Sequence, residues 1–205
     1  MTLEIEKTIE NLKGRGFGAF YAENSAEALE LVKGMVPEGS TIANGGSQTL
    51  KQTGIMDWFL RGNYDYAPHG AAGETPEEEE RSYKSAFTCD YYLMSTNAVT
   101  EEGELYNVDG RGNRVSSLCY GPEHVIVIAG KNKVVPTLED AVNRVKTVAA
   151  PKNGRRLGVK TPCAIVGSCA DCRSPQRMCC HRVITSFCRT PGRISVIIVG
   201  EDLGY

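Results

Sequence analysis

Hydrophobic residues along this chain recur with two periodicities, one helical and one typical of buried strands. Helical spacing predicts helices over residues 3–13, 25–34 and 137–148, with further helix starts near Gln48 and at Thr75-Pro76. Short apolar runs predict strands over residues 17–21, 41–43, 91–99, 105–108, 124–129 and 194–199. The two kinds of segment alternate, as in α/β proteins. The pattern therefore predicts an α/β fold with a Rossmann-like, mostly parallel sheet flanked by helices.

One segment does not follow this alternation. Residues 160–190, which precede the last predicted strand, are rich in cysteine and contain turn-forming proline and glycine. A chain of 205 residues is long enough to bury a core without help from disulfides. We therefore expect a single α/β domain over residues 1–205, with a Cys-rich insertion at about 160–190.

The composition is that of a soluble globular protein, with 41% hydrophobic residues, 23% charged residues and a formal net charge of −2. The N-terminus lacks a basic start followed by an apolar stretch, so no signal peptide is expected. The longest apolar runs have the length of strands, which argues against a membrane-spanning helix. These features predict a cytoplasmic protein, in which disulfides are rare.

The charge is unevenly distributed along the chain. The first hundred residues are acidic, whereas residues 152–193 contain nine basic side chains and a single acidic one, Asp171. Such a basic region suits a negatively charged cluster, an anionic substrate or an acidic partner protein. The overall charge and the lack of interleaved aromatic residues argue against nucleic acid as a partner.

The Cys-rich segment carries the most informative chemistry. Five of the eight cysteines fall within 18 residues. Reduced thiols at this density most often hold a metal ion or an iron–sulfur cluster. We expect four of them to be the ligands: Cys163, Cys169, Cys172 and Cys179.

The spacing of these four cysteines, C-x5-C-x2-C-x6-C, is neither that of a common zinc ribbon nor that of a bacterial ferredoxin. Iron–sulfur and zinc are therefore both open, as are reduced structural thiols or a redox disulfide. The fourth ligand also has alternatives to Cys179, namely Cys180, His181 and Cys188. The two remaining cysteines, Cys89 and Cys119, are expected to be core thiols.

A second candidate site follows the predicted strand 41–43. Gly45 and Gly46 let the backbone approach a ligand, and the following helix start presents free N–H groups to an anion. Ser47 and Thr49 add hydroxyl donors. The carboxyl end of a parallel strand is a common place for ligands, which favours a small anionic metabolite here. A plain helix cap is the alternative.

A third candidate is a glycine-spaced loop that contains Asp109, Asn113 and Arg114. Arg114 is suited to a carboxylate or phosphate, which its guanidinium can bind through two parallel hydrogen bonds. A network that only shapes the loop is the alternative. Lys131 and Lys133 follow a buried strand and add positive charge to the same edge. His69 lies in a glycine-rich loop and is more typical of a surface residue than of a base.

Several of these segments together resemble the lactate-utilization (LUD) domain family. The matching stretches are residues 43–50, 102–104, 107–110, 112–115 and 120–134, which include the runs Gly-Asn-Arg-Val and Gly-Lys-Asn-Lys-Val. The resemblance spans nearly the whole chain. It implies a fold similar to the NagB/RpiA/CoA-transferase-like superfamily, which includes sugar-phosphate isomerases. Some family members also carry an Asp-Cys-x-Ser-Pro-x-Arg-x-Cys element near the C-terminus, which residues 171–179 of this chain resemble.

The resemblance also implies a metabolic neighbourhood, because some members act beside iron–sulfur proteins in the oxidation of L-lactate to pyruvate. Our leading hypothesis is thus a protein that supports oxidation of lactate or a similar organic acid, with an iron–sulfur redox protein as partner. One alternative is a CoA-thioester transferase or sugar-phosphate isomerase with structural cysteines. Another is a non-catalytic scaffold or regulatory subunit of a redox complex. A homo-oligomer is compatible with each.

Overall fold

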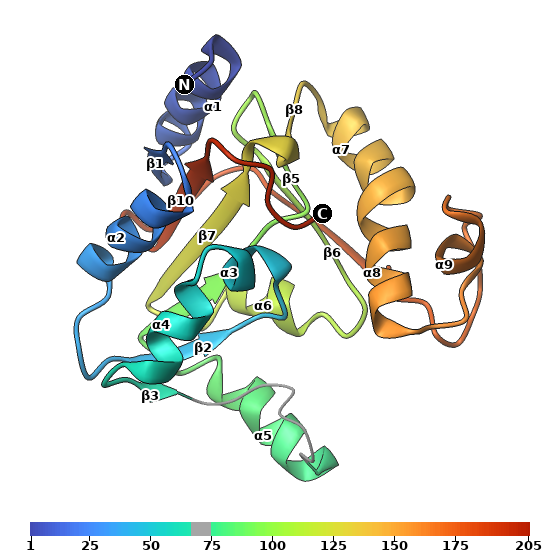
Figure 1. The fold of residues 1–205 in the computed structure, drawn as a ribbon, viewed down its shortest axis with the longest axis horizontal. Helices are drawn as coiled ribbons and strands as arrows, with labels where there is room; N and C mark the ends of the chain where they lie inside the picture. Colours follow the sequence, from blue (N-terminus) through green and yellow to red (C-terminus); the bar gives the residue numbers. More distant parts are fainter. Residues whose placement is uncertain (67–74) are drawn as a thin grey trace.

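The computed structural model describes residues 1–66 and 75–205 and is built around a six-stranded sheet (Figure 1). The strand order is β1-β10-β7-β4-β2-β3, and every neighbouring pair is parallel. The predicted mostly parallel sheet is confirmed. Its strands are β1 (Gly18–Ala22), β10 (Ile194–Val199), β7 (His124–Gly130), β4 (Tyr91–Met94), β2 (Thr41–Asn44) and β3 (Asp65–Tyr66).

Helices cover both faces of this sheet, and β7 shows why its sequence is continuously apolar. Val125 and Val127 pack in one core with residues of α1 (Leu3–Gly14) and α6 (Asn113–Cys119). Ile126 and Ile128 pack in a second core with residues of α2 (Ser25–Met35), α3 (Gln48–Gln52) and α4 (Ile55–Arg61). Successive side chains of a strand point to opposite faces, so a strand covered on both sides needs apolar residues at every position.

Helices α1 and α2 begin and end close to the predicted positions, and α3 and α5 begin where predicted, whereas α4 and α6 were not predicted. Their bounds are α1 (Leu3–Gly14), α2 (Ser25–Met35), α3 (Gln48–Gln52), α4 (Ile55–Arg61), α5 (Pro76–Ser85) and α6 (Asn113–Cys119). The predicted start of α5 is confirmed by a capping box between Thr75 and Glu78. The cap of α2 is Asn24, the residue before the predicted start at Ser25, because Asn24 Oδ1 accepts the Glu27 N–H at 3.0 Å.

A second, four-stranded sheet was not predicted. It has the order β8-β5-β6-β9, and its strands are β8 (Val134–Val135), β5 (Ala98–Thr100), β6 (Leu105–Asp109) and β9 (His181–Thr185). The predicted single strand over residues 91–99 is therefore wrong. The chain leaves the large sheet after Met94 and enters the small sheet at Ala98, so the small sheet lies beyond the carboxyl ends of the large one.

The predicted helix over residues 137–148 continues further than expected. It comprises α7 (Leu138–Arg144), a π-helical turn over Val145–Ala149 and α8 (Ala150–Leu157). Pro151, which lacks an N–H, lies just after the π-helical turn, so the helix continues past a residue that usually ends one. A short helix, α9 (Pro162–Val166), and β9 follow, so the Cys-rich insertion is partly regular structure.

None of the helices in the described residues is both long and apolar enough to cross a lipid bilayer. His69, which the sequence placed in a glycine-rich loop, lies outside the described residues.

Candidate functional site

Three loops meet at the carboxyl edge of the large sheet, where parallel sheets commonly bind ligands. Residues 45–49 follow β2, residues 95–97 follow β4, and the 3₁₀ turn Lys131–Lys133 follows β7. The three strands are neighbours in the order β7-β4-β2. The fold therefore brings together loops that are separated by about 40 residues each in the sequence.

Lys133 lies at the centre of this edge. Its side chain is only 3% exposed, and its Nζ donates to Thr49 Oγ1 at 2.9 Å and to Ser95 Oγ at 2.8 Å. Within residues 1–66 and 75–205, no carboxylate lies within ion-pair distance of this nitrogen. Burial and the nearby charges of Arg144 and Arg114 lower the pKa of Lys133 to about 7.

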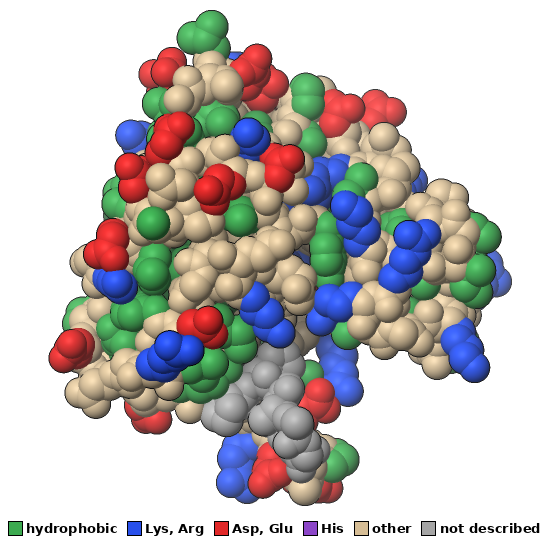
Figure 2. All heavy atoms as spheres, in the orientation of Figure 1, with side chains coloured by type: hydrophobic (Ala, Val, Ile, Leu, Met, Phe, Trp, Pro, Cys, Tyr) green, Lys and Arg blue, Asp and Glu red, His purple; other side chains and the backbone are tan. Residues whose placement is uncertain are grey.

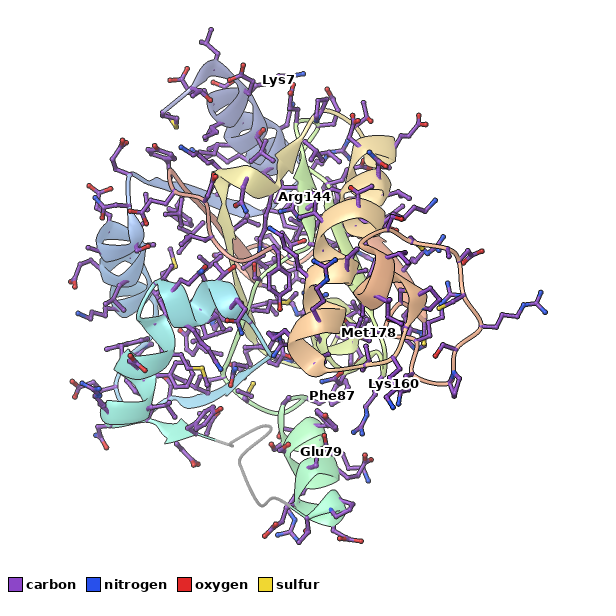
Figure 3. All side chains as sticks on the ribbon, turned by 45° about the vertical axis from the view of Figure 1, so that its right-hand side comes forward. Lys7, Glu79, Phe87, Arg144, Lys160 and Met178 are labelled. Carbon is purple, nitrogen blue, oxygen red and sulfur yellow. The ribbon has the colours of Figure 1, made fainter. Side chains whose placement is uncertain are left out.

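Arg144 supplies a second buried positive charge, on the side of α7 that faces the sheets (Figure 3). Its Nε donates to the carbonyl of Asn132 at 2.9 Å, and its Nη1 donates to that of Asn97 at 2.7 Å. In the described part of the chain Nη2 has no acceptor, and no carboxylate pairs with the guanidinium. We call Lys133 and Arg144 the buried cation pair. Sequence patterns did not single out Arg144, although it lies three residues after the buried Ala141.

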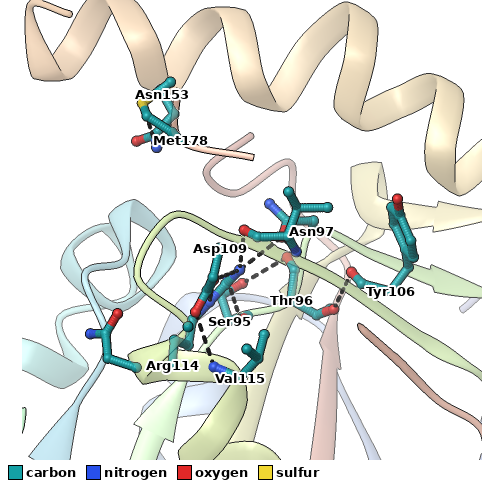
Figure 4. A network of polar contacts seen from close by, with 12 residues as sticks. Ser95, Thr96, Asn97, Tyr106, Asp109, Arg114, Val115, Asn153 and Met178 are labelled. Atoms are coloured by element: carbon teal, nitrogen blue, oxygen red, sulfur yellow. Dashed lines mark hydrogen bonds and ion pairs between the residues drawn. The ribbon is translucent and has the colours of Figure 1, made fainter. Parts of the chain in front are cut away.

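Arg114, in contrast, is neutralised by Asp109 (Figure 4). Its Nε and Nη2 lie 2.9 and 2.7 Å from Asp109 Oδ1, while its other donors bond Ser95, Asn97 and Val108. Asp109 Oδ2 accepts the N–H of Val115 at 3.0 Å, at the start of α6. Arg114 thereby ties the end of β4 to the end of β6.

The predicted loop after β2 contacts the same network. A Cβ on Gly45 would lie 3.1 Å from both Arg114 Cγ and the Tyr92 hydroxyl, so glycine permits this close approach. Ser47 caps α3, since its Oγ accepts the Leu50 N–H at 3.2 Å. Gly46 is exposed, with open space around it.

Five of the seven predicted anion-binding residues thus have assignable roles in this edge. Gly45, Asp109 and Arg114 build one network, Thr49 bonds Lys133, and Ser47 caps a helix. Asn113 is the first residue of α6, and its carbonyl accepts the hydroxyls of Ser116 and Ser117. Anion binding by these residues stays a prediction.

The segment 200–205 contacts Lys133 and the loops around it. The Leu203 N–H donates to Asn132 Oδ1 at 3.1 Å, and the Leu203 carbonyl accepts Thr49 Oγ1 at 3.4 Å. A Cβ on Gly204 would lie only 3.2 Å from Lys133 Nζ. The Tyr205 hydroxyl is held by Arg156 and by Asn153 on α8.

The structure places three of the four predicted metal ligands close to one another. Cys169 and Cys172 both act electrostatically on Cys179, and Cys169 and Cys179 line one small cavity of about 10 Å³. Burial raises the pKa of Cys179, whereas Arg177 acts in the opposite direction. Arg177 also organises the loop, since it donates to the carbonyls of Cys172 and Cys179.

The other cysteines have separate surroundings. Cys163 is buried on α9, where its Sγ lies 3.4 Å from Thr161 Oγ1. Cys180 Sγ donates to the carbonyl of Arg177, and Cys188 lies in the core of the large sheet. Cys89 is buried as expected, but Cys119 is exposed at the end of α6, so that prediction is wrong.

Zinc requires four ligand atoms that converge on one point at about 2.3 Å or less. Among the described residues, no three His, Cys, Asp or Glu side chains are gathered in this way. Cys169 and Cys172, which act electrostatically on Cys179, stay the candidate ligands together with it. The identity of the centre stays a prediction.

A comparison with known families decides the classification. The model of the LUD domain matches residues 5–199, which is nearly the whole chain. The chain belongs to the LUD domain family. The family suggests a role related to lactate utilization. No curated protein is similar enough to this LUD domain to count as a relative.

Solved structures support the same fold for this LUD domain. A DUF162-family protein from Deinococcus radiodurans is 14% identical, covers 96% of each chain and superposes with a TM-score of 0.53. Ribose 5-phosphate isomerases from Plasmodium falciparum and Neisseria gonorrhoeae are 16% and 14% identical, with TM-scores of 0.32 and 0.33. They cover 55% and 67% of this chain, and 52% and 57% of their own. The fold assignment therefore rests on the first of these structures.

The surface of the LUD domain is divided by charge (Figure 2). Acidic side chains gather over α1 and α2, whereas lysine and arginine side chains gather over α8 and α9. We call the region formed by α8 and α9 the basic arm. It also exposes three apolar side chains, Leu157, Ile165 and Val166, which are 50–72% exposed. Exposed apolar residues rimmed by like charge are typical of interaction sites.

Proposed function

We propose that this protein supports the oxidation of L-lactate or a similar organic acid by binding a small carboxylate at the buried cation pair. The observation that carries the proposal is the uncompensated charge of Lys133 and Arg144. Removing two cations from water is costly unless an anion accompanies them. A carboxylate bound at this edge would neutralise the positive charge that no carboxylate among the described residues neutralises.

The donors around the pair suit a hydroxy acid or an oxo acid. Arg144 Nη2 and Lys133 Nζ can hold a carboxylate through charge-assisted hydrogen bonds. The hydroxyls of Thr49 and Ser95 both donate and accept, so they can bond the neighbouring hydroxyl or carbonyl oxygen of the ligand. Arg114 holds the loops in place rather than binding the ligand, because Asp109 neutralises its charge.

Calorimetric titration with L-lactate, pyruvate and acetate tests this proposal, with lactamide as the uncharged control. We expect the carboxylates to bind and lactamide not to bind. In Lys133→Met the affinity should fall about tenfold to a hundredfold, as for loss of one charge-assisted bond. The exposed Lys131 offers the matched control, Lys131→Met, which should bind as wild type does. Equal affinity in Lys133→Met, or no binding of any carboxylate, overturns the proposal.

The same titration separates the alternative enzyme classes. A CoA thioester or a sugar phosphate that binds far more tightly than the simple carboxylates would favour a transferase or isomerase. The scaffold alternative predicts instead that an acidic redox protein docks on the basic α8–α9 arm. That complex should dissociate as salt is raised, because the attraction between exposed charges is screened.

We propose in addition that Cys169, Cys172 and Cys179 hold an iron–sulfur cluster, with zinc as the alternative and with Cys163 or Cys180 as the fourth ligand. The support is the cavity that Cys169 and Cys179 share and the electrostatic influence of Cys169 and Cys172 on Cys179. Bound metal would displace the thiol protons, since thiolates are the ligand form.

Oxygen-free purification followed by metal analysis and visible absorption tests the cysteine centre. We expect iron and sulfide in wild type, and their loss in Cys172→Ser. Cys119→Ser, at an exposed cysteine outside the segment, should keep the metal. Zinc without iron would select the alternative, and protein free of both metals would contradict the centre altogether.

A further inference from the structure

The two members of the buried cation pair are chemically different, and charge alone does not explain the lysine. Arginine stays protonated in proteins, so Arg144 is a permanent cation. Lysine readily changes its protonation state when it is buried. Lys133 has no carboxylate to hold its proton in the described chain, and two hydroxyls lie within 3 Å of its Nζ. A guanidinium in place of Lys133 would bind a carboxylate better.

We propose that Lys133 is a nucleophile that forms an imine with the carbonyl carbon of a small 2-oxo acid whose carboxylate is held by Arg144. This inference rests on the proposed function and names its substrate class. A 2-oxo acid is the chemical product of oxidising a 2-hydroxy acid. The ligand that the site would then bind covalently is the oxidised one.

The chemistry needs no oxidant, reductant or co-reactant. The lone pair of Nζ forms a C–N bond, and the carbonyl π electrons move onto oxygen. A proton passes from nitrogen to that oxygen, with the Thr49 or Ser95 hydroxyl as relay. The resulting carbinolamine then takes up one more proton and loses water, which leaves a protonated C=N bond.

The surroundings of Lys133 provide the neutral amine that this step requires. Burial, Arg144 and Arg114 lower the pKa of Lys133 to about 7. At neutral pH about half of Lys133 is thus unprotonated, roughly a thousandfold more than for an ordinary lysine. Desolvation and a neighbouring cation are known ways to activate a lysine nucleophile.

Reductive trapping tests the proposal. Wild type is incubated with pyruvate and cyanoborohydride, which reduces an imine to a stable secondary amine, and the adduct is mapped by peptide mass spectrometry. We expect one adduct, on Lys133, and its loss in Lys133→Met. Lys131→Met should keep it. L-Lactate, which has no carbonyl, should give none, and acetone, which has no carboxylate, should react far more slowly.

The outcomes distinguish this inference from the proposed function. Carboxylates that bind without any trapped adduct overturn the nucleophile and leave the anion site intact. Adducts spread over exposed lysines, and unchanged in Lys133→Met, overturn it as well. Lys133→Met replaces a buried cation with an apolar side chain of similar length, so we expect it to fold. The peptide map of wild type decides the question independently of that variant.

Discussion

At the scale of single residues, the burial of Lys133 is energetically costly. A lysine that is 3% exposed loses most of its hydration. Its two hydrogen bonds go to hydroxyls, which do not neutralise charge. Arg144 and Arg114 face it with like charge, and the charge of Asp109 is engaged by Arg114. The folded protein therefore favours the neutral amine more than the unfolded chain does.

This cost makes stability depend on pH in a predictable direction. The pKa of Lys133 is lowered to about 7 in the folded chain and is near 10.4 in the unfolded chain. Between these values the unfolded chain holds a proton that the folded chain has released, so this group adds stability as pH rises. We expect the free energy of unfolding of wild type, relative to that of Lys133→Met, to rise by up to about 1.4 kcal/mol per pH unit above 7. Urea unfolding at several pH values from neutral to alkaline measures the difference.

The control for this experiment is Lys131→Met, whose residue is exposed in the same turn and which should follow the wild-type pH dependence. A saturating carboxylate should flatten the slope, because an anion restores the pKa of Lys133 toward its ordinary value. A difference in unfolding free energy between wild type and Lys133→Met that stays constant across this pH range would show that Lys133 keeps its proton in the folded state.

The sequence revealed these residues only in part, for a physical reason. Lys133 was recognised as a cation after a buried strand, but its burial depends on Thr49, Ser95 and Gly204, which are far away in the sequence. Arg144 nevertheless carries a usable signal in the sequence, namely its spacing on the helix. It lies three residues after Ala141, at the spacing of one helical face, so a charge there must be buried or must interrupt the face.

At the scale of elements, most strands of the large sheet followed from pattern alone, whereas β3 and the grouping of β5, β6, β8 and β9 into a second sheet did not. β7 and β10 are apolar at nearly every position because helices cover both faces of the sheet. Residues 91–94 and 98–99 suit strands, and the polar run Ser95-Thr96-Asn97 between them is a short local break that the single predicted strand ran through. The break is fixed by tertiary bonds, since Arg114 holds the Ser95 carbonyl and the Asn97 side chain.

The helix that runs from α7 into α8 shows the opposite error. The predicted helix ended at residue 148, but the π-helical turn over Val145–Ala149 leads into α8 and the helix continues past Pro151. The continued helix matters for the site. It carries Asn153 and Arg156, which hold Tyr205, and its first part carries Arg144.

At the scale of the whole molecule, the Cys-rich segment and the ligand edge are physically connected. β9 pairs with β6 up to Asp109, and the Cys180 N–H donates to the Asp109 carbonyl at 2.9 Å. The backbone of Met178 packs against Gly110, just before the loop that carries Arg114. A centre on the cysteines would therefore lie next to the network that shapes the carboxylate site, as expected of a redox partner and a substrate site in one domain.

The segment 200–205 joins α3, the turn after β7 and α8 next to Lys133, so we expect it to limit access to this edge. Gly204 has φ +60°, and an alanine Cβ there would lie 2.6 Å from Thr49 Oγ1. Gly204→Ala should thus cost about 1 kcal/mol in strain and displace the segment. We expect reductive methylation of Lys133, mapped by mass spectrometry, to become several-fold faster.

The matched control is Gly192→Ala, because Gly192 has a similar φ of +77° and an added Cβ there would meet nothing within 4 Å. It carries the same backbone strain without the clash at the site, so Lys133 should react at the wild-type rate while stability falls by a similar amount. If both variants speed the reaction equally, general loosening of the fold explains the access. If neither does, ligands reach Lys133 by a path that avoids the segment 200–205, and the cover over the cation pair is structural.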